Sequence, residues 1–274
     1  MAYASYVVPT GEFGGAYREW SNTASQAERQ KLALSFWLQV NKAVAEPDFS
    51  FGLNYYGDGA IEYRVTDTAM YLAYYDGVSS SDDFEEIISG ASLTLEVWDH
   101  YLFTVDTTQT IPGDRVKIYR NGTLLSPSVE VPPALDFAAR LLASGDVMSL
   151  FVYSEDGPAK FAFVEFVTGS APGPDAFAFD DNGTWTRKPY TGARGSYGFL
   201  LDGSDGFNDA SGNGHHFLAD GEIDLDPNDL PPHVAAEEGF SGIYIGNTQI
   251  NAIKHGTNDV VAVYHGETKI FEAG

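Results

Sequence analysis

The sequence predicts an all-β protein made of a β-sandwich, a loop-rich extension and a short C-terminal β repeat. Short β-prone runs broken by Gly, Pro, Asn and Asp fill most of the 274 residues, which is the pattern of a sandwich or barrel. Aromatic residues, which sheets favour, make up 14% of the chain. Helical patterns are confined to residues 134–143 and to residues 24–32, where Ser25 and Glu28 have capping-box spacing.

The clearest strands alternate between apolar and polar residues, at 34–40, 101–106 and 115–120. In the first run, one face carries Leu34, Phe36 and Leu38, and the other carries Ser35, Trp37 and Gln39. Asn121-Gly122 follows the third run and predicts a tight hairpin turn, because both residues tolerate positive φ. Residues 149–153 and 161–167 are two further predicted strands, and the second is apolar enough to be buried on both faces.

The chain is strongly acidic, with 15 Lys and Arg against 39 Asp and Glu and a net charge of −24. Such a field repels phosphate backbones and anionic lipid, so we expect no nucleic-acid partner and no membrane insertion. The charge favours solubility, and clustered carboxylates leave cation binding open. There are no cysteines, which excludes disulfides and thiolate metal sites. The N-terminus lacks a secretory pattern, so we expect synthesis in a cytoplasm.

Composition divides the chain into three predicted parts. Residues 1–170 hold the strand patterns of the sandwich, and residues 171–235 are rich in Gly, Asp, Asn and Pro. We expect this second part to be ordered loops that wrap the sandwich, because its many aromatic side chains need burial. Residues 236–274 form the third part, a β repeat punctuated by glycine.

The repeat is marked by Gly246, Gly256 and Gly266, which lie ten residues apart. Each is followed four positions later by a β-branched residue, and this spacing predicts a three-stranded meander with glycine at each corner. So small a unit cannot bury its own apolar face. We therefore expect it to serve anchoring or oligomerisation, with docking in cis or in trans both open.

Several of these segments resemble known protein families. Residues 34–40, 98–106 and 116–122 resemble the core strands of concanavalin A-like, laminin-G-like jelly rolls, in which a Trp-x-His strand and a Tyr-x-Asn-Gly hairpin recur as packing elements. Residues 177–180, 185–190, 195–202 and 209–217 resemble the tail of lectin-like proteins of tailed bacteriophages and phage-derived particles. Here Lys188 precedes Pro189, the reverse of that family's order, and His215 stands where Asn is usual.

The resemblance covers about residues 20–232 and implies a concanavalin A-like jelly-roll sandwich. It also implies a non-enzymatic virion appendage, such as a fibre, spike or tail-associated protein, that binds host cell-surface polysaccharide. Its partners would then include other virion proteins and further copies of the chain, assembled in the host bacterial cytoplasm. A purely structural virion adaptor is the alternative. A polysaccharide-degrading glycoside hydrolase is a third and less favoured one.

The hydrolase alternative rests on Glu222, Asp224 and Asp226, which would share one face of a strand. Jelly-roll endoglucanases of the laminarinase type carry two glutamates that flank an aspartate in a similar arrangement. Here the second glutamate is replaced by Asp226, and Pro227 follows it. Because the separation of the two carboxyl groups decides their chemistry, the shorter side chain argues against catalysis.

Two tyrosine-rich patches supply the candidate sugar-binding residues. Sugars present a C–H face that stacks on aromatic rings and hydroxyls that pair with carboxylates. The candidates are Tyr56, Asp58, Tyr75 and Asp76. Strand alternation leaves at least one tyrosine of each pair to ordinary sheet packing.

A calcium ion is the one candidate cofactor. Asp202, Asp205 and Asp209 offer oxygen ligands separated by glycines, a composition that suits a hard cation. The alternative is a tight turn in which these side chains cap backbone amides. His215-His216 is not expected to bind zinc, because adjacent residues on a strand point in opposite directions.

Overall fold

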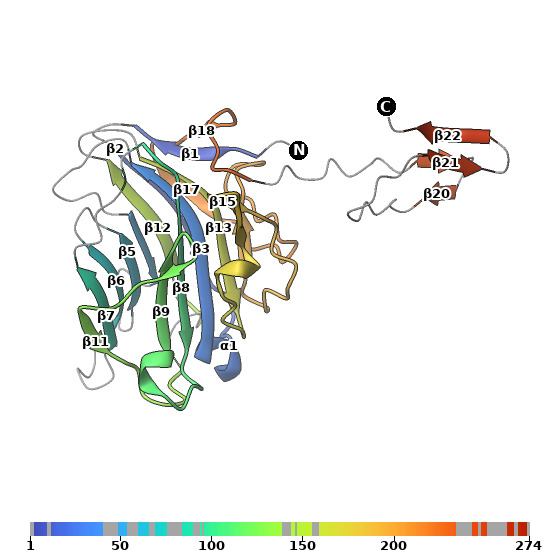
Figure 1. Ribbon diagram of the computed structural model, residues 1–274. Coiled ribbons are helices and arrows are strands. Elements are labelled where there is room, and N and C mark those ends of the chain that lie inside the picture. Colours follow the sequence, from blue (N-terminus) through green and yellow to red (C-terminus); the bar gives the residue numbers. More distant parts are fainter. Residues whose placement is uncertain are drawn as a thin grey trace. The chain divides into compact units, whose positions relative to one another are not determined.

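The computed structural model divides the chain into two compact units, Met1–His233 and Val234–Gly274 (Figure 1). In the first unit it describes residues 3–9, 12–40, 49–53, 60–65, 69–75, 84–89, 94, 96–138, 144–145, 147–154 and 159–233. In the second it describes residues 243–245, 248–250, 262–265 and 268–272.

The first unit is a sandwich of two antiparallel sheets, each with eight described strands. The first sheet has the spatial order β10 (Thr123–Leu124), β9 (Val116–Arg120), β8 (Asp99–Asp106), β3 (Lys31–Val40), β13 (Ala159–Thr168), β1 (Ser5–Val8) and β18 (Asp224–Asp226), with β16 (Phe199–Leu201) paired to β13. The second has the order β11 (Val129–Val131), β7 (Phe84–Ser89), β6 (Ala69–Tyr75), β5 (Ala60–Val65), β4 (Phe49–Leu53), β12 (Val147–Ser154), β2 (Glu12–Glu19) and β17 (Leu218–Gly221). The predicted all-β sandwich is confirmed.

The main core lies between the two sheets. Alternation directs Leu34, Phe36 and Leu38 of β3 into it, as predicted, together with Tyr101 and Phe103 of β8. Met148 and Leu150 of β12 close the core from the second sheet. Ser35 and Trp37 therefore belong to the opposite side of β3, the outer face of the first sheet.

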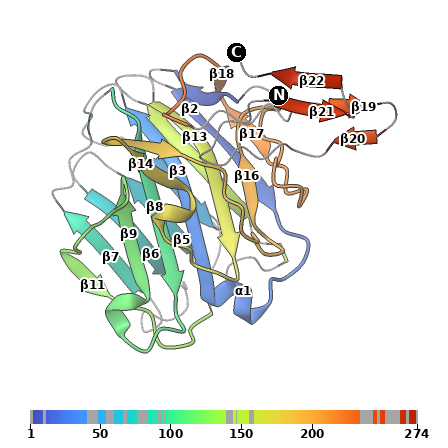
Figure 2. The same cartoon turned by 45° about the vertical axis from the view of Figure 1, so that its right-hand side comes forward.

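Part of that outer face is covered by the segment that follows β13. Phe163 of β13 and Trp37 pack against Ala178, which begins β14 (Ala178–Asp181). Strand β14 pairs with β15 (Thr184–Arg187), and Figure 2 shows β14 crossing in front of β3 and β13. Residues 161–168 of β13 are consequently buried throughout, which confirms the predicted two-sided burial.

Residues 171–233 combine loops with five short strands, β14 to β18. Of these, β16 and β18 extend the first sheet, whereas β17 extends the second. The segment thus contributes hydrogen-bonded strands to both layers, and it lies in the same compact unit as the sandwich.

Helix is scarce, as expected. Helix α1 (Gln26–Gln30) begins with the predicted capping box, in which the Glu28 amide donates to Ser25 Oγ and the Ser25 amide donates to Glu28 Oε2. The helix predicted over residues 134–143 is wrong in its described part, residues 134–138. There Asp136 adopts φ 60° and its amide donates to the Thr107 carbonyl, which holds a turn. No helix in the described part of the chain is long and apolar enough to cross a membrane.

The predicted Asn121-Gly122 hairpin joins β9 to β10. Both residues have positive φ, 46° and 75°. A Cβ at Gly122 would also lie 2.5 Å from the Trp185 ring, so glycine is required for space as well as for conformation.

The second unit contains two hairpins. Strand β19 (Ile243–Ile245) pairs with β20 (Thr248–Ile250), and β21 (Ala262–His265) pairs with β22 (Thr268–Glu272). The prediction of one three-stranded meander is wrong for these strands, which form two separate two-stranded sheets. Gly246 and Gly266 are not among the described residues, so their predicted place at strand corners stays a prediction. Gly256 lies outside the described residues.

Candidate functional site

The candidate sugar-binding residues fall mostly outside the described part of the chain. Tyr56, Asp58 and Asp76 are not among the described residues. Tyr75 is the last residue of β6, and only its backbone is among the described parts of the chain. Their proposed role stays a prediction.

The calcium candidates lie in a loop of hydrogen-bonded turns. Asp202 Oδ1 accepts from the amide and hydroxyl of Ser204, at 3.0 and 2.7 Å, and Asp205 Oδ2 accepts from Asn208 at 2.8 Å. Asp209 is the most engaged of the three, because its carboxylate accepts the amides of Leu200, Ser211 and His215. Burial opposes its charge, yet these donors hold the pKa of Asp209 below its usual value.

This arrangement matches the turn-capping alternative. No group of three or more potential metal-ligating side chains comes together among the residues that the structure describes. A calcium ion in this loop remains a prediction.

The acidic triad of the hydrolase alternative lies at a sheet edge. Strand β18 is the last strand of the first sheet and pairs with β1 on one side. Glu222 and Asp224 are exposed, and Asp226 Oδ1 accepts the Asn228 amide at 2.9 Å to cap a turn.

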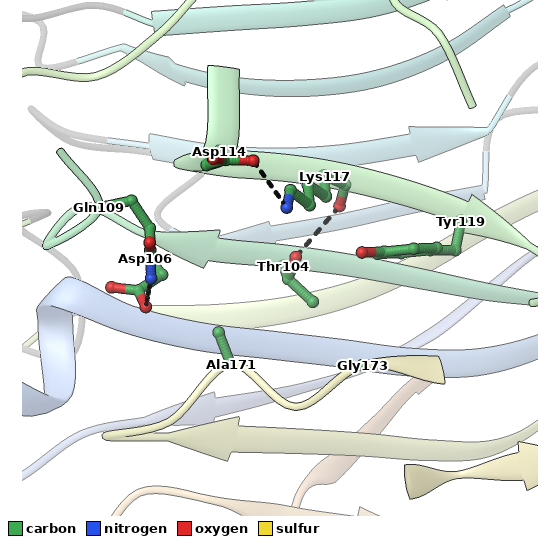
Figure 3. Close-up of a pocket in the computed structure, with 8 residues that line it drawn as sticks. All are labelled: Thr104, Asp106, Gln109, Asp114, Lys117, Tyr119, Ala171 and Gly173. Carbon is green, nitrogen blue, oxygen red and sulfur yellow. Dashed lines mark hydrogen bonds and ion pairs between the residues drawn. The ribbon is translucent and has the colours of Figure 1, made fainter. Parts of the chain in front are cut away.

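A different site is present on the outer face of the first sheet. A cavity of about 290 Å³ lies over β8 and β9, beside the turn η1 (Pro112–Asp114) and the segment that leaves β13 (Figure 3). Its lining residues are Thr104, Asp106, Gln109, Asp114, Lys117, Tyr119, Ala171 and Gly173. We call this cavity the β8–β9 groove.

Strand alternation brings the polar side chains of the groove together. Thr104 and Asp106 lie on β8 at the positions between its core-facing residues, and Lys117 and Tyr119 do so on β9. The register pairs Thr104 directly with Lys117. Tyr119 also packs against the small apolar cluster around Leu102 and Phe177, which supports its ring. Figure 3 shows its hydroxyl directed toward Thr104 and Lys117.

Asp106 organises one end of the groove. Its Oδ1 accepts from the Thr108 hydroxyl at 2.6 Å and from the Thr108 amide at 3.1 Å, and its Oδ2 accepts from Gln109 at 2.8 Å. Lys31 Nζ lies 3.5 Å from the same Oδ2. Burial opposes the charge, but these donors hold the pKa of Asp106 below its usual value, so it is ionised at neutral pH.

The opposite wall carries an ion pair. Lys117 Nζ lies 2.9 Å from Asp114 Oδ1, and both side chains are partly exposed. The hydrogen bond that the Lys117 ammonium donates to Asp114 raises the pKa of Lys117 above its usual value, and the nearby Tyr119 phenol adds to the effect. The groove thus presents an ammonium, a carboxylate and a phenol within one small space.

Hydrogen bonds from a buried side chain hold the loop after β8 in place beside the groove. The buried Arg115 donates to the Gln109 carbonyl at 2.9 Å and to the Pro133 carbonyl at 2.7 Å, which ties the loop after β8 to residues near β11. Such preorganisation lowers the entropic cost of ligand binding.

The Trp-x-His and Asn-Gly motifs occupy the covered part of the same strands. The fully buried His100 receives a hydrogen bond from Trp185 Nε1 on Nδ1, at 3.0 Å. Because the indole can only donate, Nε2 carries the proton and donates to Ser35 Oγ at 2.9 Å. Burial lowers the pKa of His100 to about 3. Asn121 completes the network by accepting from the His100 amide and donating to Asp99. These motifs are packing elements, as their resemblance implied.

None of the groove residues was a sequence-based candidate. The available signal was a run of polar or charged residues at successive outward positions of two adjacent strands, Thr104 and Asp106 on β8 and Lys117 and Tyr119 on β9. That signal does not separate a binding face from a solvated one. Only the position of residues 171–173 beside the strands closes the cavity.

Comparison with known proteins agrees with the architecture. Residues 13–147 match the family model of the concanavalin A-like lectin/glucanases superfamily, and the sandwich has the jelly-roll fold of that superfamily. No curated protein matches the sequence.

Three solved structures illustrate the similarity. A carbohydrate-binding candidate from Bacteroides ovatus is 12% identical with a TM-score of 0.50, covering 85% of this chain and 62% of its own. The heptameric SAP-like pentraxin from Limulus polyphemus is 11% identical with a TM-score of 0.49, covering 82% and 95%. The botulinum neurotoxin serotype D binding domain is 11% identical with a TM-score of 0.43, covering 62% and 40%. At these identities the likeness concerns the fold alone.

Proposed function

From the concanavalin A-like fold of the sandwich, we propose that this protein binds carbohydrate without chemistry, and that the β8–β9 groove is its binding site. The observation that carries the proposal is the groove itself. It combines a supported aromatic side chain, Tyr119, with hydroxyl, amide, carboxylate and ammonium groups in a cavity of about 290 Å³. Aromatic rings contact the C–H face of sugars, and the polar groups pair with hydroxyls.

Binding is favoured over hydrolysis by the placement of the carboxylates. Asp106 is fully engaged with Thr108, Gln109 and Lys31, and Asp114 is paired with Lys117. A glycosidase needs one carboxyl group that holds a proton and a second that is free to act on the sugar. Neither Asp106 nor Asp114 is placed to act as the carboxyl group that holds a proton, because each already accepts hydrogen bonds or pairs with a lysine.

We further propose that the protein acts in a virion appendage of a tailed phage or phage-derived particle, where it attaches to host cell-surface polysaccharide. The resemblance of residues 177–217 to phage lectin-like proteins supports this setting. The separate C-terminal unit suits attachment to other virion proteins or to further copies of the chain. Flanking capsid or tail genes would support this role, and their absence would count against it.

Glycan-array binding of the full chain, followed by titration calorimetry, tests the sugar-binding proposal. We expect Tyr119→Ala to weaken binding about tenfold or more, as loss of a central aromatic contact does. Tyr17→Ala, at an exposed tyrosine of β2 on the second sheet, is the matched control and should bind as the parent does.

Two results would contradict the proposal. Loss of binding in Tyr17→Ala alone would move the site to the second sheet. A parent protein that binds no glycan yet assembles firmly into virions would favour the purely structural adaptor.

A further inference from the structure

We propose that the β8–β9 groove selects neutral saccharides with adjacent hydroxyl groups, which the Lys117–Asp114 pair recognises together, and rejects saccharides that carry carboxylate, sulfate or phosphate. This inference rests on the proposed function and names the ligand class of the same site.

Each cationic side chain at or beside the groove already has a protein partner. Lys117 is the cation among the described residues that line it, and its ammonium is paired with Asp114 at 2.9 Å. Lys31 faces Asp106 at 3.5 Å, and the buried Arg115 donates to main-chain carbonyls. An anionic ligand would bring a further negative charge beside carboxylates that already balance these cations, so the repulsion between like charges opposes its binding.

The remaining hydrogen-bonding capacity suits hydroxyl groups. Lys117 has three N–H donors, of which Asp114 takes one, while the Asp114 Oδ2 atom is engaged by no described residue. The Tyr119 hydroxyl has no hydrogen-bond partner among the described residues, and it lies close to Lys117. The oxygens of Asp106, by contrast, are occupied by Thr108, Gln109 and Lys31. Asp106 therefore holds the loop after β8 in place and does not contact the ligand.

A paired ammonium and carboxylate match two neighbouring hydroxyls of a sugar ring. Adjacent ring hydroxyls are separated by about the length of a hydrogen bond, as are Lys117 Nζ and Asp114 Oδ1. One hydroxyl can accept from the ammonium while its neighbour donates to the carboxylate. Both new bonds are charge-assisted, and the pair itself stays intact.

The electrostatic field acts in the same direction. The groove lining carries two carboxylates against one ammonium, and the whole chain has a net charge of −24. Acidic polysaccharides are therefore repelled at a distance as well as in contact, most strongly at low ionic strength.

The test compares two probes of similar length, neutral β-glucan oligosaccharides and polygalacturonate oligosaccharides. Affinity is measured by titration calorimetry with the full chain, at low salt and near 0.15 M salt. We expect the neutral series to bind, the polygalacturonate series to fail at both salt concentrations, and the neutral series to be insensitive to salt. Polygalacturonate oligosaccharides that bind as tightly as the neutral series, or more tightly, would overturn the inference while the proposed function stands. Failure of both probes would count against the inference and the proposed function alike.

Variants of the pair sharpen the test. Asp114→Asn should weaken neutral binding about tenfold or more, as loss of a hydrogen bond to a charged group does. It also frees Lys117, so weak polygalacturonate binding should appear. The exchange of both residues, Asp114→Lys with Lys117→Asp, should restore part of the neutral binding. Asp220→Asn, at an exposed residue of β17, is the control and should change neither affinity. Unchanged neutral binding in a folded Asp114→Asn protein, checked by its melting temperature, would overturn the inference.

Discussion

The outer face of β8 passes from a sealed region to an open one within a few residues. His100 and Leu102 are fully buried beneath the extension, whereas Thr104 and Asp106 face the β8–β9 groove. In the sealed region both ring nitrogens of His100 are hydrogen-bonded, one to Trp185 and the other to Ser35. In the open region the Lys117–Asp114 pair retains unused donors and acceptors. Polar residues of the same sheet face therefore stabilise the fold where they are covered and are available for recognition where they are not.

The ion pairs of this face show the same contrast. Arg194 donates to Glu165 of β13 under the extension, with Nε and Nη2 at 2.7 and 2.5 Å from Oε1. The Glu165 side chain is only 3% exposed, against 41% for Asp114 in the groove. Burial raises the pKa of Glu165 even with Arg194 beside it.

The largest expected effect lies in this sealed pair. Arg194→Met leaves Glu165 buried without its partner, and we expect the free energy of unfolding to fall by about 3–5 kcal/mol. Urea unfolding at neutral pH measures the change. The double variant Arg194→Met with Glu165→Gln should recover much of the loss, and a single variant as stable as the parent would show that the pair is not sealed.

A pH-dependent effect of intermediate size is expected from His100. Its pKa falls from 6.5 to about 3 on folding, so below pH 6.5 the unfolded chain binds a proton that the folded chain does not. Its contribution to stability is complete above pH 6.5 and is lost as the pH falls toward 3, which amounts to about 2 kcal/mol between pH 7 and pH 5. Urea unfolding across this range should show a shallower pH dependence for His100→Phe than for the parent. An equal pH dependence of the unfolding free energy in the variant and the parent would contradict the burial of His100 away from solvent.

The smallest expected effect is in the groove. Lys117→Met should change the free energy of unfolding by less than about 1 kcal/mol, because a partly exposed ion pair contributes little. The same substitution should abolish most saccharide binding. A large loss of stability would place Lys117 with the structural pairs and weaken the distinction between the two regions.

Sequence reasoning found the elements whose rules are local. Alternation in β3, the capping box at Ser25 and the Asn121-Gly122 turn each depend on a few neighbouring residues, and all three are confirmed. Burial of β13 on both faces also followed from its largely apolar run, which only Glu165 interrupts.

The errors arose where distant segments decide the outcome. The helix predicted from residue 134 is displaced in its described part by a turn tied to Thr107, a contact that spans elements. The groove was missed for a similar reason, since its wall at Ala171 follows β13 while its floor belongs to β8 and β9. Long-range placement of this kind leaves no periodic signal in the chain.

Methyl NMR of the full chain tests the central claim most directly, because it locates the ligand by residue. Thr104 and Ala171 line the groove, whereas Ala73 is a buried residue of β6 in the second sheet. We predict that titration with a bound neutral oligosaccharide shifts the methyl signals of Thr104 and Ala171 and leaves that of Ala73 in place. A shift confined to Ala73, with Thr104 and Ala171 unchanged, would contradict the assignment of the binding site.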